Sequence, residues 1–377
     1  METMQNRESH GRLIFFRGMV VLVIVFILIS CEPFTTSSAS ITNTVNANEP
    51  TTEVPSTPPI LPAIYQPKAL NPLDTPRTYV QDTCRYLRNK WHPANAEPGT
   101  VVMIIMFHGI FSSQPETPEN LDGIETLEFA WIMEQLKKQG FEAINTKEFL
   151  AFMERNVKIP SRSVLIIQDD PHGAEYFDKY FGDAWENWKW PVVNGWNSQS
   201  DMTEAMLQEN ALMETEGRVD HQLQGMVAGS ILSDDSSKAI IGRELENPID
   251  PFTKLFQKTP IAIIWPGGGF GLRPVQAARE LGYQLGFTAN SRGPVMYNWV
   301  PLADEYDPER PAYLPDAQVK DPLMTLPRYW PYQVLDNIDT VRIMGNQAAE
   351  YAQENKTVEF EYYKVVCEST YGPIPTP

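Results

Sequence analysis

The chain has little positive charge for its length. Its 377 residues include 30 Lys and Arg against 48 Asp and Glu, which gives a formal net charge of −18 and a pI of about 4.7. Nucleic acids require a basic face, so this balance argues against a nucleic-acid partner. The sequence also has no internal repeat and no Gly-x-Ser-x-Gly motif, and the absence of that motif argues against a serine esterase.

Cysteine and histidine are scarce as well, with 3 and 5 residues. Beyond Cys31 only Cys84 and Cys367 remain. An exported protein could join them in a disulfide, and two free buried thiols fit nearly as well, because spacing alone does not show proximity. No histidine follows His221. Residues 267–271 are rich in glycine, but no lysine follows them as a phosphate-binding loop requires.

Residues 1–30 have the pattern of an export signal. Three arginines precede an apolar run at residues 19–29, which is too short for a comfortable membrane span. Residues 28–31, Leu-Ile-Ser-Cys, resemble a bacterial lipobox, which implies cleavage before Cys31 and a lipid on its sulfur. The alternative is an uncleaved anchor with an ordinary cysteine. Both place the bulk of the chain outside the cytoplasm, on a membrane.

The remainder divides by composition into a tether, a globular domain and a tail. Residues 31–69 are rich in Ser, Thr and Pro and cannot bury enough apolar surface to fold. Residues 70–368 contain the apolar runs that a core needs. Residues 369–377 end in a Pro-rich stretch that predicts a frayed, flexible tail.

Apolar runs in the domain alternate with helical patterns. Residues 101–107 and 164–167 are continuously apolar, which is typical of strands buried on both faces. Between them, residues 125–139 and 147–155 have helical spacing and flank a short strand. This alternation predicts an α/β fold with parallel strands covered by helices. Further on, proline-dense residues 301–331 predict an irregular surface excursion, and residues 358–366 predict a final strand.

Two neighbouring carboxylates follow the second apolar run. Asp169 and Asp170 come directly after it, and chemistry in α/β folds is placed at the carboxyl ends of such strands. Adjacent carboxylates repel each other and favour a cation or a proton between them. The alternative is a turn in which an aspartate caps the next helix.

The order of these pieces resembles the polysaccharide deacetylase (NodB-homology) family, the metal-dependent carbohydrate esterases. That family's opening strand ends in an aromatic-His pair, as residues 106–109 (Met-Phe-His-Gly) do. Residues 136–149 resemble its first helix–strand–helix unit, and residues 159–170 resemble its Asp-Asp strand. Residues 261–268 resemble its late strand with a Pro-x-Gly turn. The resemblance implies an irregular (β/α) barrel with seven strands.

The resemblance also implies a chemistry, which is hydrolysis of acetyl groups on an amino-sugar glycan of the cell surface or wall. A divalent metal, usually zinc, polarises the acetyl carbonyl and lowers the pKa of a bound water. Carried over to this sequence, Asp169 takes the position of the catalytic base and Asp170 that of a metal ligand. The family's other two ligands are histidines spaced His-x-x-x-His.

The sequence departs from the family at those two ligands. The best register places Gln224 and Ala228 there, and neither is a good zinc ligand. A shifted set could combine Asp170 with His172 and His221. Against it, alternating strand residues would point His221 away from Gln224.

Several residues are candidates for substrate binding. His108 ends a strand near the same mouth, although a structural histidine is the alternative. Trp188 and Trp196 could offer flat apolar faces to sugar rings, although tryptophans also fill cores. The family turn adds Trp265, Pro266 and Gly267. Two hypotheses follow, a lipid-anchored deacetylase that uses zinc and a metal-free protein of the same fold that binds glycan without hydrolysis.

Overall fold

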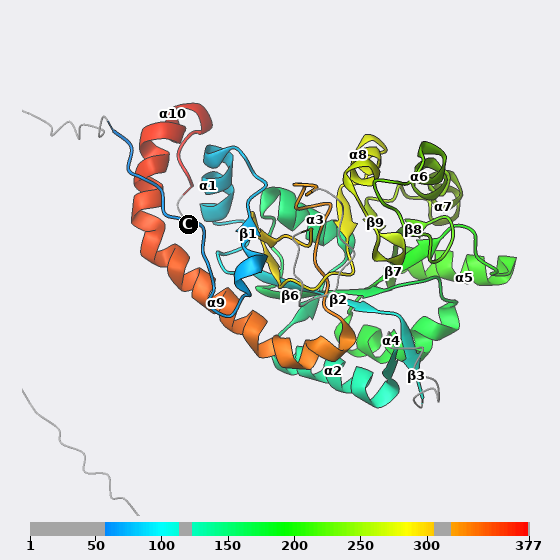
Figure 1. Cartoon of the computed structure of the whole chain (residues 1–377). Coiled ribbons are helices and arrows are strands. Elements are labelled where there is room, and N and C mark those ends of the chain that lie inside the picture. The colour runs from blue at the N-terminus through cyan, green and yellow to red at the C-terminus, as the bar shows by residue number, and fades with distance from the viewer. Residues whose placement is uncertain (1–56, 113–122, 305–317, 376–377) are drawn as a thin grey trace, which may run out of the picture. The chain divides into compact units, whose positions relative to one another are not determined.

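The computed structural model describes residues 57–112, 123–304 and 318–375 (Figure 1). All of them belong to one compact unit, Val54–Pro377. The predicted export signal, the lipid site Cys31 and most of the predicted tether lie outside the described residues. Within the described ranges, no helix is both long enough and apolar enough to cross a membrane.

A curled, mostly parallel sheet forms the centre of the molecule. Its path runs through seven strands, with β5 (Glu142–Ala143) paired to β6 beside the path. All pairs are parallel except that of the last strand with β2. In spatial order the strands are β10 (Leu285–Phe287), β9 (Ala262–Ile264), β8 (Val219–Gly225), β7 (Val192–Asn197), β6 (Arg162–Gln168), β2 (Val101–Phe107) and β11 (Val295–Met296).

Residues 323–329 connect the two sides of this sheet. Leu326 forms a parallel bridge to Phe287 of β10, and Tyr329 forms one to Ile105 of β2. With these bridges the segment closes the sheet into an irregular barrel, which confirms the predicted α/β barrel. The prediction of a surface excursion over residues 301–331 is therefore wrong for its final part.

Helices cover the outside of the sheet. The described helices are α1 (Thr83–Trp91), α2 (Thr126–Lys138), α3 (Thr146–Arg155), α4 (Ala174–Trp188), α5 (Glu204–Thr215), α6 (Lys238–Leu245), α7 (Ile249–Phe256), α8 (Leu272–Glu280), α9 (Pro331–Tyr362) and α10 (Glu368–Tyr371). Two small sheets pair β1 (Pro76–Arg77) with β12 (Val300–Pro301) and β3 (Gly109–Phe111) with β4 (Gly123–Glu125). Figure 1 shows α9 running from the barrel to α1 and α10.

The predicted strand at residues 358–366 is wrong. The segment continues α9 and ends in a π-helical turn, Tyr363–Cys367. Its valines and aromatics favour a strand by propensity, but propensity is a weak guide when tertiary burial competes with it. Here Tyr363 and Cys367 are buried against α1.

Side chains of the central strands alternate between two cores. On β2, Val101, Met103, Ile105 and Phe107 pack toward α2 and α9, whereas Val102 and Ile104 pack inside the ring. On β6, Leu165 and Ile167 belong to the inner cluster. Because side chains alternate along a strand, residue 169 continues this inner series and points into the mouth of the barrel.

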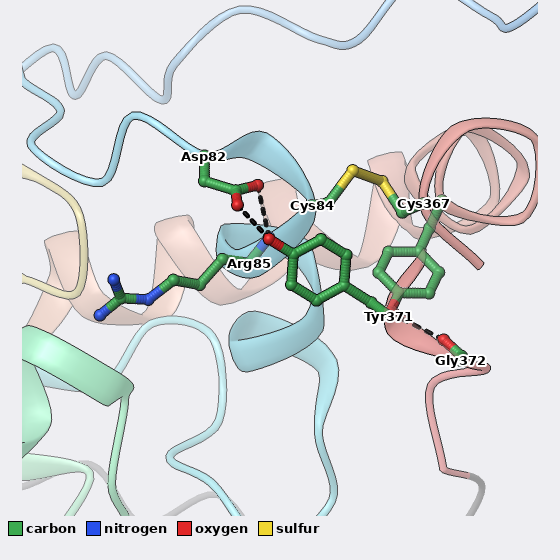
Figure 2. Close-up of a disulfide and its surroundings, with 7 residues drawn as sticks. Asp82, Cys84, Arg85, Cys367, Tyr371 and Gly372 are labelled. Atoms are coloured by element: carbon green, nitrogen blue, oxygen red, sulfur yellow. Dashed lines mark hydrogen bonds between the residues drawn. A yellow bond between two sulfur atoms is a disulfide. The ribbon is translucent and has the colours of Figure 1, made fainter. Parts of the chain in front are cut away.

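A disulfide joins Cys84 of α1 to Cys367, so the structure forms one of the two alternatives (Figure 2). Beside it, the Tyr371 hydroxyl donates a hydrogen bond to Asp82. Asp82 caps α1 by accepting from the backbone N–H of Arg85 at 3.0 Å. Ile374, which falls in the predicted frayed tail, is buried in the same cluster.

The end of the predicted tether contacts the domain. The Trp299 indole donates to the carbonyl of Tyr65 at 2.9 Å, and the Tyr351 hydroxyl donates to the carbonyl of Ala63 at 2.6 Å. These two bonds bring residues 63–65 onto α9 and the loop before β12, ahead of the predicted domain start at residue 70.

Candidate functional site

Asp169 lies at the carboxyl end of β6 and is clamped by an arginine. Its backbone N–H extends the pairing of β6 with β2 by donating to the carbonyl of Phe107 at 2.7 Å. Its two carboxylate oxygens accept from Nη1 and Nη2 of Arg328 at 2.5 and 3.0 Å. Both side chains are almost fully buried, at 3% and 1% exposure. A bidentate, buried pair of this kind fixes the carboxylate in orientation.

Arg328 belongs to the segment that closes the barrel. Its Nε donates to the carbonyl of Thr288 at 2.6 Å, so the guanidinium is held from both sides. Arg328 is not among the residues that the sequence predicts for the site. It lies 159 positions from Asp169 in a proline-dense stretch, and nothing local to it indicates the contact.

His108 touches the same carboxylate, as its position after β2 predicts. Its Nε2 lies 3.3 Å from Oδ2 of Asp169. Its other ring nitrogen, Nδ1, is buried and has no hydrogen-bond partner among the described residues. The predicted proximity of His108 to the aspartate pair is therefore present.

Asp170 has a strained backbone and a half-buried side chain. Its φ of 64° lies in the left-handed region, which is uncommon for residues other than glycine. Burial, and next the neighbouring charge of Asp169, raise the pKa of its carboxyl above the ordinary value of 3.8. Two amide side chains secure its backbone: Oε1 of Gln224 accepts from its N–H at 2.7 Å, and Nδ2 of Asn194 donates to its carbonyl at 2.8 Å.

Gln224 reaches Asp170 across β7 because residue 195 is glycine. A Cβ at Gly195 would lie 2.5 Å from Oε1 of Gln224, so any larger residue would collide with that amide. At this family ligand position the amide oxygen is thus committed to a backbone N–H. Ala228, at the other ligand position, is exposed in the turn after β8.

His172 belongs to a separate cluster with Gln168. Its ring stacks on that of Tyr176 at a centroid distance of 3.8 Å, and its Nε2 lies 3.0 Å from Nε2 of Gln168. Burial lowers the pKa of His172 to about 4, so the ring is neutral at neutral pH. Gln168 also donates to the carbonyl of His108, which ties the ends of β2 and β6 together.

His221 lies on the outer face of β8. It is fully buried, and its ring stacks on Phe256 at 4.1 Å. Its Nδ1 and Nε2 lie 3.1 and 3.2 Å from oxygens of Glu214 and Asn210. Gln222 and Gln224 occupy the alternate positions of β8. The alternation that argued against a shifted ligand set therefore holds in the structure.

The residues at the mouth do not fit a zinc ion. A structural or catalytic zinc takes at least three N, O or S ligands from the protein. Among the described residues at the mouth, Asp170 is the one carboxylate left over, since Arg328 holds Asp169 and its positive charge opposes a second cation there. No group of three His, Cys, Asp or Glu side chains suited to a metal occurs in the part of the chain that the structure describes.

The tryptophans predicted to bind substrate are not available at the mouth. Trp196 and Trp265 are 2% and 1% exposed, so neither offers a ring face to a ligand. Trp188 ends α4, ahead of the amino end of β7, and packs against Trp190. Pro266 and Gly267 follow β9 at the mouth side, where Pro266 is buried against the end of β8.

Two amide oxygens near the mouth also lack partners. Oδ1 of Asn194 and Oδ1 of Asn197 are buried and accept no hydrogen bond from the described residues. Both residues lie on β7, which ends at the mouth. Buried acceptors without partners cost free energy, and at 0% and 1% exposure neither side chain is open to a ligand in this conformation.

Comparison with known proteins supports the fold. No protein-family model matches the chain, and no curated protein sequence matches it. Among solved structures, the chain is similar to the deacetylase PplD of Streptococcus pyogenes, determined in complex with acetate. That match has a TM-score of 0.50 and 18% identity, and it covers 65% of this chain and 99% of PplD.

A second similar structure is IcaB from Ammonifex degensii, with a TM-score of 0.47 and 13% identity over 65% of this chain and 98% of IcaB. At these identities the likeness concerns the fold alone, and PplD is the structure that supports it. The predicted resemblance is confirmed at that level: the chain has the barrel fold of the polysaccharide deacetylases.

Proposed function

We propose that this chain is a lipid-anchored, extracytoplasmic protein that binds an acetylated amino-sugar glycan at the barrel mouth without metal-dependent hydrolysis. The observation that carries the proposal is the Asp169–Arg328 clamp. The guanidinium engages both oxygens of Asp169, and its positive charge also acts on Asp170, where it opposes a bound cation. Gln224 supports the same conclusion, because its amide oxygen already accepts from Asp170.

Binding is supported by what the mouth leaves unsatisfied. Nδ1 of His108, on a side chain that is 24% exposed, lacks a hydrogen-bond partner among the described residues, and a donor from a ligand could supply one. Sugar hydroxyls and acetamido N–H groups are such donors, and a hydroxyl can pair with either form of the imidazole. The lipobox-like residues 28–31 would hold the domain at the membrane, where surface glycans are within reach.

Hydrolysis is the second candidate function. It is favoured by the placement of Asp169, Asp170 and His108 at one mouth of a barrel shared with PplD, itself a deacetylase determined with acetate. The two candidates differ in a measurable product, because hydrolysis releases acetate and binding does not.

The test uses the full-length chain in detergent, with N-acetylglucosamine oligomers and their deacetylated counterparts as matched ligands. We expect calorimetry to show tighter binding of the acetylated oligomers, and no acetate release with or without added zinc. Zinc-dependent acetate release that Asp170→Asn abolishes would overturn the proposal in favour of the hydrolase. Equal binding of both oligomers, or none, would overturn the glycan assignment.

A further inference from the structure

Three aromatic rings follow one another from the aspartate clamp toward the surface. The ring of His108, which touches Asp169, is nearly parallel to that of Trp330, with centroids 5.5 Å apart and planes at 12°. Trp330 is in turn nearly parallel to Tyr332, at 6.3 Å and 20°. These values are typical of offset stacking, in which each ring covers only part of its neighbour. We call His108, Trp330 and Tyr332 the aromatic row.

The middle ring of the row, Trp330, is held by hydrogen bonds within the protein. Nε1 of Trp330 donates to the carbonyl of Ala289 at 3.0 Å, and its backbone N–H donates to Oε1 of Gln333 at 3.0 Å. Trp330 is the N-cap of α9, and Pro331 begins that helix with a fixed φ. Because Trp330 is already held, a ligand would not have to order that ring on binding.

Exposure rises along the row. The side chain of His108 is 24% exposed, Trp330 is half-buried, and Tyr332 is 63% exposed. Single exposed aromatic residues are common and need no explanation. Tyr332 differs because its ring continues a stack that leads into the mouth. Trp131 of α2 is similarly exposed, at 51%, but stacks on no other ring in the described part of the chain.

We infer that the aromatic row is a stacking platform for consecutive sugar rings of a neutral glycan, with Tyr332 binding a sugar outside the mouth. This inference rests on the proposed function and adds the path along which the glycan lies on the protein. Pyranose rings present flat C–H faces that pack on aromatic faces, which are large and rigid. The glycan is neutral because a chain with a net charge of −18 repels an anionic polymer.

The platform predicts a dependence on ligand length. A short N-acetylglucosamine oligomer held at the mouth would not reach Tyr332, whereas a long one would. Tyr332→Ala is therefore expected to weaken binding of the long oligomer about tenfold, the effect of losing roughly one aromatic contact. Binding of the short oligomer is expected to stay unchanged.

The test compares four forms of the full-length chain in detergent by calorimetry: wild type, Tyr332→Ala, Tyr332→Phe and Trp131→Ala. Tyr332→Phe keeps the ring and is expected to bind like wild type, and Trp131→Ala is the matched control for loss of an exposed aromatic side chain. Equal loss for short and long oligomers, or no loss in Tyr332→Ala, would overturn the platform while leaving glycan binding intact. Absence of binding in the wild type would overturn both proposals.

Discussion

The two ends of the barrel differ in what holds their elements together. At the carboxyl end, charged and amide side chains bind one another and the backbone, as the contacts of Asp169 and Gln224 show. At the amino end, the Cys84–Cys367 disulfide and the buried pair of Lys90 with Glu359 hold α1 against the C-terminal helices. A cavity of about 310 Å³ remains among α1, α9 and residues 61–65 at this end.

This difference shows where the fold is constrained. Near-complete internal pairing around Asp169 makes the mouth rigid and leaves few polar groups for a ligand. The amino end is less tightly filled and depends on a covalent link. We therefore expect substitutions of charged residues to change the free energy of unfolding most at the mouth. Removal of the disulfide is expected to change it most at the amino end.

The largest expected effect is at the clamp. Arg328→Met leaves the buried Asp169 carboxylate without its charged partner, and breaking a buried pair in this way costs about 3–5 kcal/mol of unfolding free energy. Urea unfolding followed by far-UV circular dichroism measures the loss. Adding Asp169→Leu to Arg328→Met is expected to recover most of it, because no isolated charge then stays buried. If Arg328→Met alone is as stable as wild type, the Asp169–Arg328 pair does not stabilise the fold.

The next effect concerns the amino end. Replacing Cys84 and Cys367 together by alanine is expected to cost about 2–5 kcal/mol, since the unfolded chain is no longer constrained across a long loop. Dithiothreitol should destabilise the wild type by a similar amount and leave the double variant unaffected. If reduction leaves the urea midpoint of the wild type unchanged, the disulfide does not stabilise this end.

The smallest expected effect is a gain in unfolding free energy when Asp170 is replaced. A carboxyl whose pKa is raised by folding contributes stability below its ordinary value of 3.8, and this contribution is lost as the pH rises through the folded pKa. Asp170→Asn is therefore expected to stabilise the protein at neutral pH, by less than either loss above, and to give no gain below the ordinary pKa. Asparagine also tolerates the left-handed backbone at this position.

The control for that gain is Asp201→Asn, which changes an exposed aspartate. Its urea midpoint should shift little at either pH. A gain at Asp170 that persists in acid would mean that backbone conformation, rather than carboxylate ionisation, limits stability there.

Prediction from the sequence worked where a local pattern determined the outcome. The continuous apolar runs of β2 and β6 follow from burial on both faces, and their pairing brings His108 beside Asp169. It failed where the outcome depends on distant contacts. Arg328 reaches Asp169 only because residues 323–329 close the ring, and the segment before Cys367 is helical because it packs on α1.

The cysteine pair also changes what a cut in the backbone would do. Because 283 positions separate its two members, it turns nearly the whole barrel into one covalent ring. A protease that cleaves once between residues 85 and 366 would leave both fragments attached to each other. A cut ahead of residue 84 would instead release the intact ring from whatever precedes it.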